Sequence, residues 1–136
     1  MVRTVGRLVT AGETAAVPLS FVLVLPGWTE QLYWSELERL GDLRPSPVRA
    51  RLLIAAADHG YVSGAQHQKK DRLMDSSFDT LVVVLQNERG AAKGGDGFAV
   101  PAGFEAGLRG AFRRSLPTDA MRDRLVASGY KKQKRR

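Results

Sequence analysis

The residue types that could do chemistry gather in segment 58–70, which contains both histidines of the chain. His59 and His67 are eight residues apart across a glycine, so they lack the i, i+4 spacing that places two metal ligands on one helix face. A triad of Asp58, Ser63 and His67 would need the G-x-S-x-G turn that exposes a serine nucleophile, and the residues around Ser63 do not form that motif. We therefore expect a hydrogen-bonded or substrate-contacting loop here, with no metal site and no catalytic residue.

A second segment with a chemical pattern is the glycine-rich run 90–97. A phosphate-binding P-loop needs Gly, four residues and then Gly-Lys-Ser/Thr, placed between a strand and a helix. Here Lys93 precedes the glycine pair instead of following it, and no Ser or Thr is placed to bind magnesium. The sequence therefore predicts a flexible linker in this segment.

Pro26 and Trp28 directly follow the apolar run 19–25, which is rich in Val, Leu and Phe. In open α/β sheets, ligands bind beyond the carboxyl ends of the strands. An indole at such a strand end can stack on a nucleic-acid base or on a cap structure. The alternative is that Trp28 anchors the helix that follows.

Positive charge is concentrated near the end of the sequence. Residues 1–108 carry 11 Lys and Arg against 12 Asp and Glu, whereas residues 109–136 carry 10 against 2. The basic run 131–136 suits phosphate binding or nuclear import, and the alternative is a disordered solubilising tail. Lys69 and Lys70 are further candidates for phosphate contacts, because Gln66 and His67 precede them.

Alternation of apolar runs and turn residues predicts the elements that position these side chains. We expect buried strands at 19–25, 51–57 and 80–85, with the long polar connection 58–79 before the third. The continuous apolar character of residues 19–25 indicates a strand buried on both faces, as in a parallel sheet. Helices are expected at 3–16, where the helix runs into a loop, at 30–40 with Thr29 as its cap, from 101 onwards, and at 117–127.

Length and composition favour one α/β domain. A chain of 136 residues with 43% hydrophobic residues can bury a single core. The absence of cysteine excludes disulfides, cysteine-ligated zinc and thiol catalysis in these residues. No apolar run approaches the roughly 20 residues of a membrane span, so we expect no membrane partner, and no targeting segment at the N-terminus.

Three segments together resemble the catalytic domain of the phosphorylated-CTD-interacting factor family, the cap-specific adenosine N6-methyltransferases of eukaryotic mRNA. They are the strand PLSFVLVLPGW at 18–28, the loop YVSGAQH at 61–67 followed by Lys69 and Lys70, and the strand LVVVL at 81–85 closing on Gln86 and Asn87. The similarity covers about residues 17–93.

The resemblance implies a Rossmann-like methyltransferase fold, S-adenosylmethionine as cofactor, capped mRNA as substrate, a nuclear location and proximity to RNA polymerase II and its CTD. The Asn-Pro-Pro-Phe catalytic motif of the family and its cofactor-binding glycine loop do not occur in this sequence. In addition, Gly27 stands at a position where we expect the family to have Glu. The fold class expected is therefore α/β, the C-terminal half of such a sheet with trailing helices and a basic tail. The corresponding division is 1–100 for the partial methyltransferase-like domain, 101–128 for the helices and 129–136 for the tail.

Two functions remain open at this point. The first is a fragment or truncated relative of the methyltransferase that forms the RNA-side wall of the site and binds no S-adenosylmethionine by itself. The residues expected to bind substrate are Pro26, Trp28, Ser63, Gln66, His67, Lys69 and Lys70. The second is a non-catalytic RNA-binding or scaffolding subunit whose sheet is covered by a partner chain.

Overall fold

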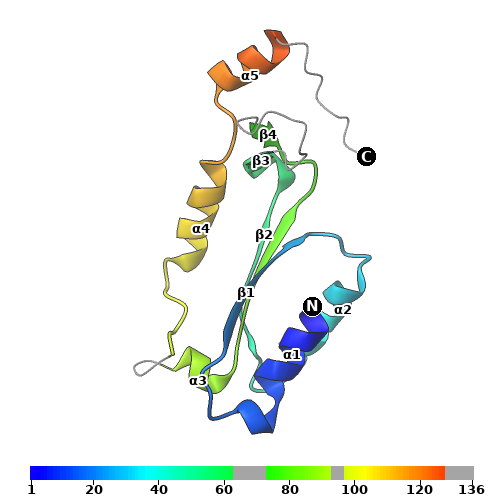
Figure 1. Ribbon diagram of the computed structural model, residues 1–136, viewed down its shortest axis with the longest axis vertical. Coiled ribbons are helices and arrows are strands. Elements are labelled where there is room, and N and C mark those ends of the chain that lie inside the picture. The colour runs from blue at the N-terminus through cyan, green and yellow to red at the C-terminus, as the bar shows by residue number, and fades with distance from the viewer. Residues whose placement is uncertain (63–72, 93–96, 128–136) are drawn as a thin grey trace. The chain divides into compact units, whose positions relative to one another are not determined.

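The computed structural model describes residues 1–62, 73–92 and 97–127 (Figure 1). The chain divides into two compact units. Unit 1 comprises Met1–Leu53 and Thr80–Phe104, and unit 2 comprises Ile54–Asp79 and Glu105–Arg136.

Unit 1 is built on a small antiparallel sheet of three strands in the order β1-β5-β2. The strands are β1 (Ser20–Pro26), β5 (Thr80–Gln86) and β2 (Val48–Ile54). Their Val, Leu, Ile and Phe side chains suit a pleated surface, and the first and third strands are confirmed close to their expected bounds. The second strand begins three residues earlier than expected and ends at Ile54, after which residues 56–58 form the short 3-10 helix η2 (Ala56–Asp58).

The register between β1 and β5 sorts their side chains onto two faces. Leu23 lies opposite Val83 and Leu25 lies opposite Leu81, so these four residues share one face of the sheet. All four are buried, and they belong to a single hydrophobic cluster. The core of unit 1 therefore lies on this face.

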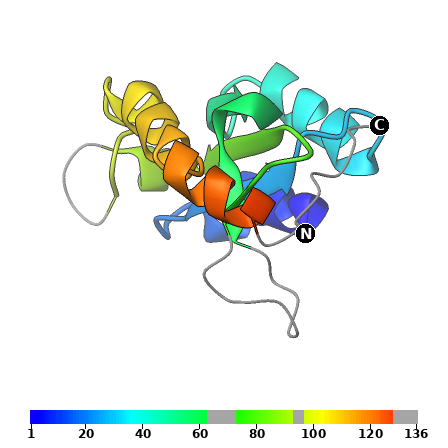
Figure 2. The same ribbon diagram turned by 90° about the horizontal axis from the view of Figure 1, so that it is seen from above.

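Two helices cover this face, as both ribbon views show (Figure 1, Figure 2). They are α1 (Val2–Thr10) and α2 (Leu32–Asp42). Val2, Val5 and Val9 recur at helical spacing on α1 and join Leu37 and Leu40 of α2 in the core cluster.

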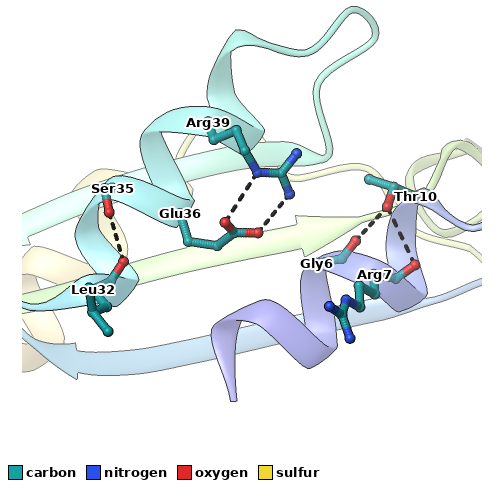
Figure 3. A network of polar contacts seen from close by, with 7 residues as sticks. All are labelled: Gly6, Arg7, Thr10, Leu32, Ser35, Glu36 and Arg39. Atoms are coloured by element: carbon teal, nitrogen blue, oxygen red, sulfur yellow. Dashed lines mark hydrogen bonds and ion pairs between the residues drawn. The ribbon is translucent and has the colours of Figure 1, made fainter.

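Figure 3 shows α1 and α2 side by side over the sheet. At Gly6 an added Cβ would lie 3.0 Å from the Leu40 side chain, so a small residue permits the close approach of the helices. The polar contacts drawn stay within each helix: Thr10 donates to the Gly6 carbonyl at 2.8 Å, and Ser35 donates to the Leu32 carbonyl at 3.0 Å. None of the polar contacts drawn joins α1 to α2, so apolar packing holds the two helices together.

The expectation that the first strand is buried on both faces is wrong. Val22 and Val24, which point away from the α1 and α2 side, are 55% and 54% exposed. β1 is antiparallel to β5, and among the described strands it pairs with β5 alone. In β2, Leu53 is likewise 43% exposed, although Leu52 and Ile54 are buried as expected.

Two local details also differ from the sequence-based expectation. Helix α2 begins at Leu32, and Gln31, not Thr29, is its N-cap, without a side-chain hydrogen bond. The flexible linker expected from residue 90 is wrong for its first residues, because α3 (Glu88–Ala91) forms there and Gly90 is buried. Residues 93–96 lie outside the described part of the chain.

Unit 2 contains a short hairpin that the sequence did not suggest. Strands β3 (Gly60–Val62) and β4 (Leu73–Asp75) pair antiparallel within the expected polar connection 58–79. Three residues per strand are too few for an alternating pattern to stand out. The later elements are α4 (Phe104–Arg113) and α5 (Asp119–Ala127), which confirm the two expected trailing helices.

Candidate functional site at the carboxyl end of β1

The chain turns tightly after the last residue of β1. The Tyr33 hydroxyl donates to the Pro26 carbonyl oxygen, which ties the first turn of α2 to the strand end. The Gln31 amide donates to the Trp28 carbonyl at 3.2 Å, and the Trp34 amide donates to the Gln31 carbonyl at 3.0 Å. These bonds position the segment between β1 and α2 while leaving the Trp28 side chain 45% exposed.

A second indole lies close to the same strand end, on α2. The Arg51 guanidinium carbon is 4.6 Å from the centroid of the Trp34 ring, which is a cation–π distance. Glu38 accepts a hydrogen bond from Trp34 Nε1 at 3.2 Å and lies 3.9 Å from the Arg51 guanidinium. Trp34 is thus held by two charged neighbours, whereas Trp28 presents a more exposed indole. Sequence reasoning did not single out Trp34, and only its spacing of six residues from Trp28 could have drawn attention to it.

The structure describes only part of the predicted binding set. Pro26 and Trp28 lie at the strand end, as the sequence predicted. Ser63, Gln66, His67, Lys69 and Lys70 lie outside the described residues, so their approach to Trp28 stays a prediction.

The surroundings of His59 indicate a structural role for this residue. Its ring is fully buried, Nδ1 lies 2.8 Å from the Ala55 carbonyl oxygen, and the ring meets Phe112 edge-on at a centroid distance of 5.7 Å. Asp58 instead faces Arg113, at 3.8 Å. Within residues 1–62, 73–92 and 97–127, no group of three His, Asp or Glu side chains is placed to hold a metal ion.

The pair Gln86 and Asn87 organises the opposite end of the sheet. Asn87 Oδ1 accepts from the amides of Leu19 at 3.1 Å and Gly90 at 2.7 Å. Its Nδ2 donates to the carbonyls of Thr14 and Val17, at 3.3 and 2.7 Å. All four hydrogen-bonding positions of this amide are used, so Asn87 has a structural role although it closes one of the segments that carry the family resemblance.

In the described residues, no helix has the length and apolar character that a membrane span requires. No family model matches the sequence. Similar proteins are, however, found among curated enzymes, and they are methyltransferases.

The mRNA (2'-O-methyladenosine-N(6)-)-methyltransferase of Mus musculus is 36% identical to this chain over 85 residues, and the protein of that name from Homo sapiens is 35% identical over 83 residues. The two alignments take in 61% and 60% of this chain but only 12% and 11% of the relatives' length. The resemblance to this family is confirmed, and the chain spans about 12% of the curated relatives that it matches.

Methyltransferases of this family use S-adenosylmethionine, whose sulfonium carries a positive charge. Two hollows among the described residues are poorly suited to that cofactor. A cavity at the amino end of β1 is lined by Arg44 and Arg49, whose charges repel a sulfonium. The hollow beside Trp34 is lined by segment 29–38 alone, so no second element faces it to enclose a nucleoside.

Proposed function

We propose that this chain is part of an S-adenosylmethionine-dependent cap-specific mRNA (2'-O-methyladenosine-N6) methyltransferase and forms the RNA-side wall of its site. The similarity to the two curated methyltransferases over 60% of the chain carries this proposal. The Rossmann-like sheet of such an enzyme would continue at the free edge of β1, which pairs with β5 alone among the described strands. Further protein would cover Val22 and Val24, which are exposed on one face of this strand. The catalytic motif and the cofactor site of the enzyme would be formed by residues that are not in this sequence.

In this proposal the chain binds and orients RNA and performs no chemical step. Trp28 stacks on a base or on the cap, since its indole is exposed just after the carboxyl end of β1. Transfer to an exocyclic amine depends mainly on how the acceptor nitrogen is oriented, and a stacked base has few orientations left. Lys69, Lys70 and the basic run 131–136 would contact phosphates, and the same run supports a nuclear location.

The test is the affinity for a capped RNA oligonucleotide whose first nucleotide is 2'-O-methyladenosine, measured by fluorescence anisotropy. We expect Trp28→Ala to weaken binding by about tenfold, because one base–aromatic stack is lost. Phe98→Ala is the matched control, since Phe98 is 50% exposed in the same unit but lies far along the chain from the strand end. Equal affinities of wild type and Trp28→Ala would contradict the stacking role.

A second measurement addresses the basic run. Deleting residues 131–136 removes five Lys and Arg side chains. If they contact RNA phosphates, the slope of log K against log salt should become shallower by about 3.5 for single-stranded RNA. An unchanged slope would show that the run makes no phosphate contact.

The second candidate function is a non-catalytic RNA-binding or scaffolding subunit. The exposed valines of β1 favour it as well, because a partner chain could cover them. The intact mass of the protein from its own source separates the two candidates. A mass well above 14.9 kDa supports a piece of a methyltransferase, whereas 14.9 kDa with a stoichiometric partner supports the subunit.

A further inference from the structure

The outer surface of α1 carries two arginines, Arg3 and Arg7. The valines that recur on this helix turn into the core, and both arginines are exposed on its other side. They are four residues apart, so their side chains are neighbours along one face of the helix. No Asp or Glu occurs before Glu13 in the sequence, so α1 contributes only positive charge to this surface.

The neighbouring helix α2 adds Glu36 and Arg39 to the same surface (Figure 3). Arg39 donates to both carboxylate oxygens of Glu36, from Nε at 3.1 Å and from Nη2 at 2.6 Å. This hydrogen bonding lowers the pKa of Glu36, and the positive charges of Arg3 and Arg7 lower it further, as expected for groups that lie near the carboxylate. We call these four residues the arginine cluster.

The arginine cluster holds more positive charge than its one carboxylate can balance. Glu36 is already engaged by its bidentate hydrogen bond within α2. In the part of the chain that the structure describes, no salt bridge involves Arg3 or Arg7. Glu38, two residues after Glu36, points to the other side of α2. The cluster therefore leaves an uncompensated positive charge at the surface of unit 1.

Helix α4 shows that this is not a property of every exposed arginine. Arg109 and Arg113 have the same spacing as the arginines of α1, but each has a carboxylate of its own. Arg109 lies 3.4 Å from Glu105, and Arg113 lies 3.8 Å from Asp58. An arginine that is already paired has less to gain from a phosphate than one without a carboxylate partner.

The arginine cluster belongs to the same unit as Trp28 and lies shortly after it along the chain. Helix α2 begins at Leu32, and Glu36 follows about 6 Å further along the helix axis. A guanidinium presents its N–H groups in a fork that matches two phosphate oxygens, so arginine suits recognition of a phosphate backbone.

We propose that the arginine cluster binds the phosphate backbone of the RNA strand whose base stacks on Trp28. Arg3 and Arg7 contact the phosphates, and Arg39, held in place by Glu36, adds the N–H groups that the carboxylate does not use. This inference rests on the proposed RNA-binding function. It adds a path for the strand, from the carboxyl end of β1 across α1 and α2.

The double variant Arg3→Gln/Arg7→Gln tests the cluster, with anisotropy of a capped RNA oligonucleotide measured over a range of salt concentrations. Arg109→Gln/Arg113→Gln is the matched control, because it removes the same charge at the same spacing from another exposed helix face. The slope of log K against log salt should become shallower by about 1.4 for the α1 variant, since two single-strand phosphate contacts are lost. The control should keep the wild-type slope. An unchanged slope for the α1 variant, or an equal change in both variants, would overturn the proposal.

A capped dinucleotide separates this proposal from the stacking role of Trp28. Trp28→Ala should weaken binding of the dinucleotide and of the longer RNA alike. The α1 variant should weaken only binding of the longer RNA, by about tenfold. Wild-type binding of the longer RNA by the α1 variant would contradict the arginine cluster alone, whereas a wild-type protein that binds neither RNA would contradict both proposals.

Two measurements on the wild type keep the test independent of any variant's folding. In an NMR titration with the longer RNA, the Nε–H signals of Arg3 and Arg7 should shift, and stationary signals would contradict the proposal. Poly-glutamate offers negative charge but no base to Trp28, so it should compete with the RNA at least about tenfold less well. Equal competition would assign the cluster to an acidic protein instead of RNA.

Discussion

Strands β5 and β1 are both seven-residue runs of mainly Val and Leu, yet their surroundings differ sharply. Every residue of β5 is buried, whereas Val22 and Val24 of β1 are more than half exposed. β5 lies between two strands, and β1 pairs with β5 alone among the described residues. In the described residues β5 is therefore the centre of the sheet, and β1 and β2 are its two edges.

The difference shows that apolar content alone does not report how a strand is buried. Only some of the apolar side chains of β1 are buried in unit 1, because α1 and α2 cover only the face that carries Leu23 and Leu25. Exposed apolar side chains on an edge strand are typical of a surface that packs against further protein.

The largest expected effect comes from comparing a truncation in each strand. Leu85→Ala removes a fully buried side chain from the core cluster and should lower the free energy of unfolding by about 2–5 kcal/mol. Val24→Ala, at a 54% exposed position, should lower it by less than about 1 kcal/mol. Urea denaturation of both variants measures the difference, and similar losses would mean that β1 is covered in the isolated chain.

An intermediate effect is expected at Asn87, which ties the amino end of the open strand to the centre of the sheet. Asn87→Ala leaves the Leu19 and Gly90 amides without their acceptor and should cost about 1–3 kcal/mol in thermal or urea unfolding. Asn87→Asp keeps that acceptor, but its second carboxylate oxygen would be buried against the Thr14 and Val17 carbonyl oxygens, so this variant should also be less stable than wild type. A wild-type stability for Asn87→Ala would show that β1 needs no such tie.

The smallest effect concerns the helices on the covered face. The hydrogen bond from Arg39 lowers the pKa of Glu36 (Figure 3). Since the folded pKa is below the unfolded one, the stabilisation is present above the unfolded pKa of about 4.3 and is lost as pH falls through the folded value. Arg39 is 56% exposed, so solvent screens the pair and the contribution is small.

Unfolding curves of wild type and Arg39→Gln recorded between about pH 6 and pH 3 measure that contribution. The two proteins should differ slightly at the upper end and converge at the lower end. A large difference at neutral pH would mean that this ion pair within α2 contributes much more to stability than an exposed pair normally does.

The sequence was a good guide where a pattern is long and local. The apolar runs predicted β1 and β5 close to their bounds, and both strands contribute to the core of unit 1. The sequence also placed Pro26 and Trp28 at a strand end. These features depend on neighbours along the chain, which a pattern can record.

Features that depend on distant contacts could not be predicted in this way. The sequence around Gly90 suggests a flexible run, but an added Cβ would collide with the carbonyl oxygen of Leu19, the residue just before β1. The cavity at the amino end of β1 forms only when the end of α1, the segment 43–49 and the end of β5 meet, and these are far apart in the sequence. The exposure of Val22 and Val24 likewise depends on which strands are neighbours, and nothing in the run itself records that.

The pairing of β1 with β5 has a consequence for the order of folding. Ser20 and Gln86, which face each other across the two strands, are 66 residues apart in the chain. At roughly 5–20 residues per second, a ribosome needs several seconds to make the partner after β1 has been synthesised. During that interval the apolar segment of β1 has no strand to pair with. Because the two strands are far apart in the sequence, their pairing should make folding slow compared with that of a helical chain of similar size.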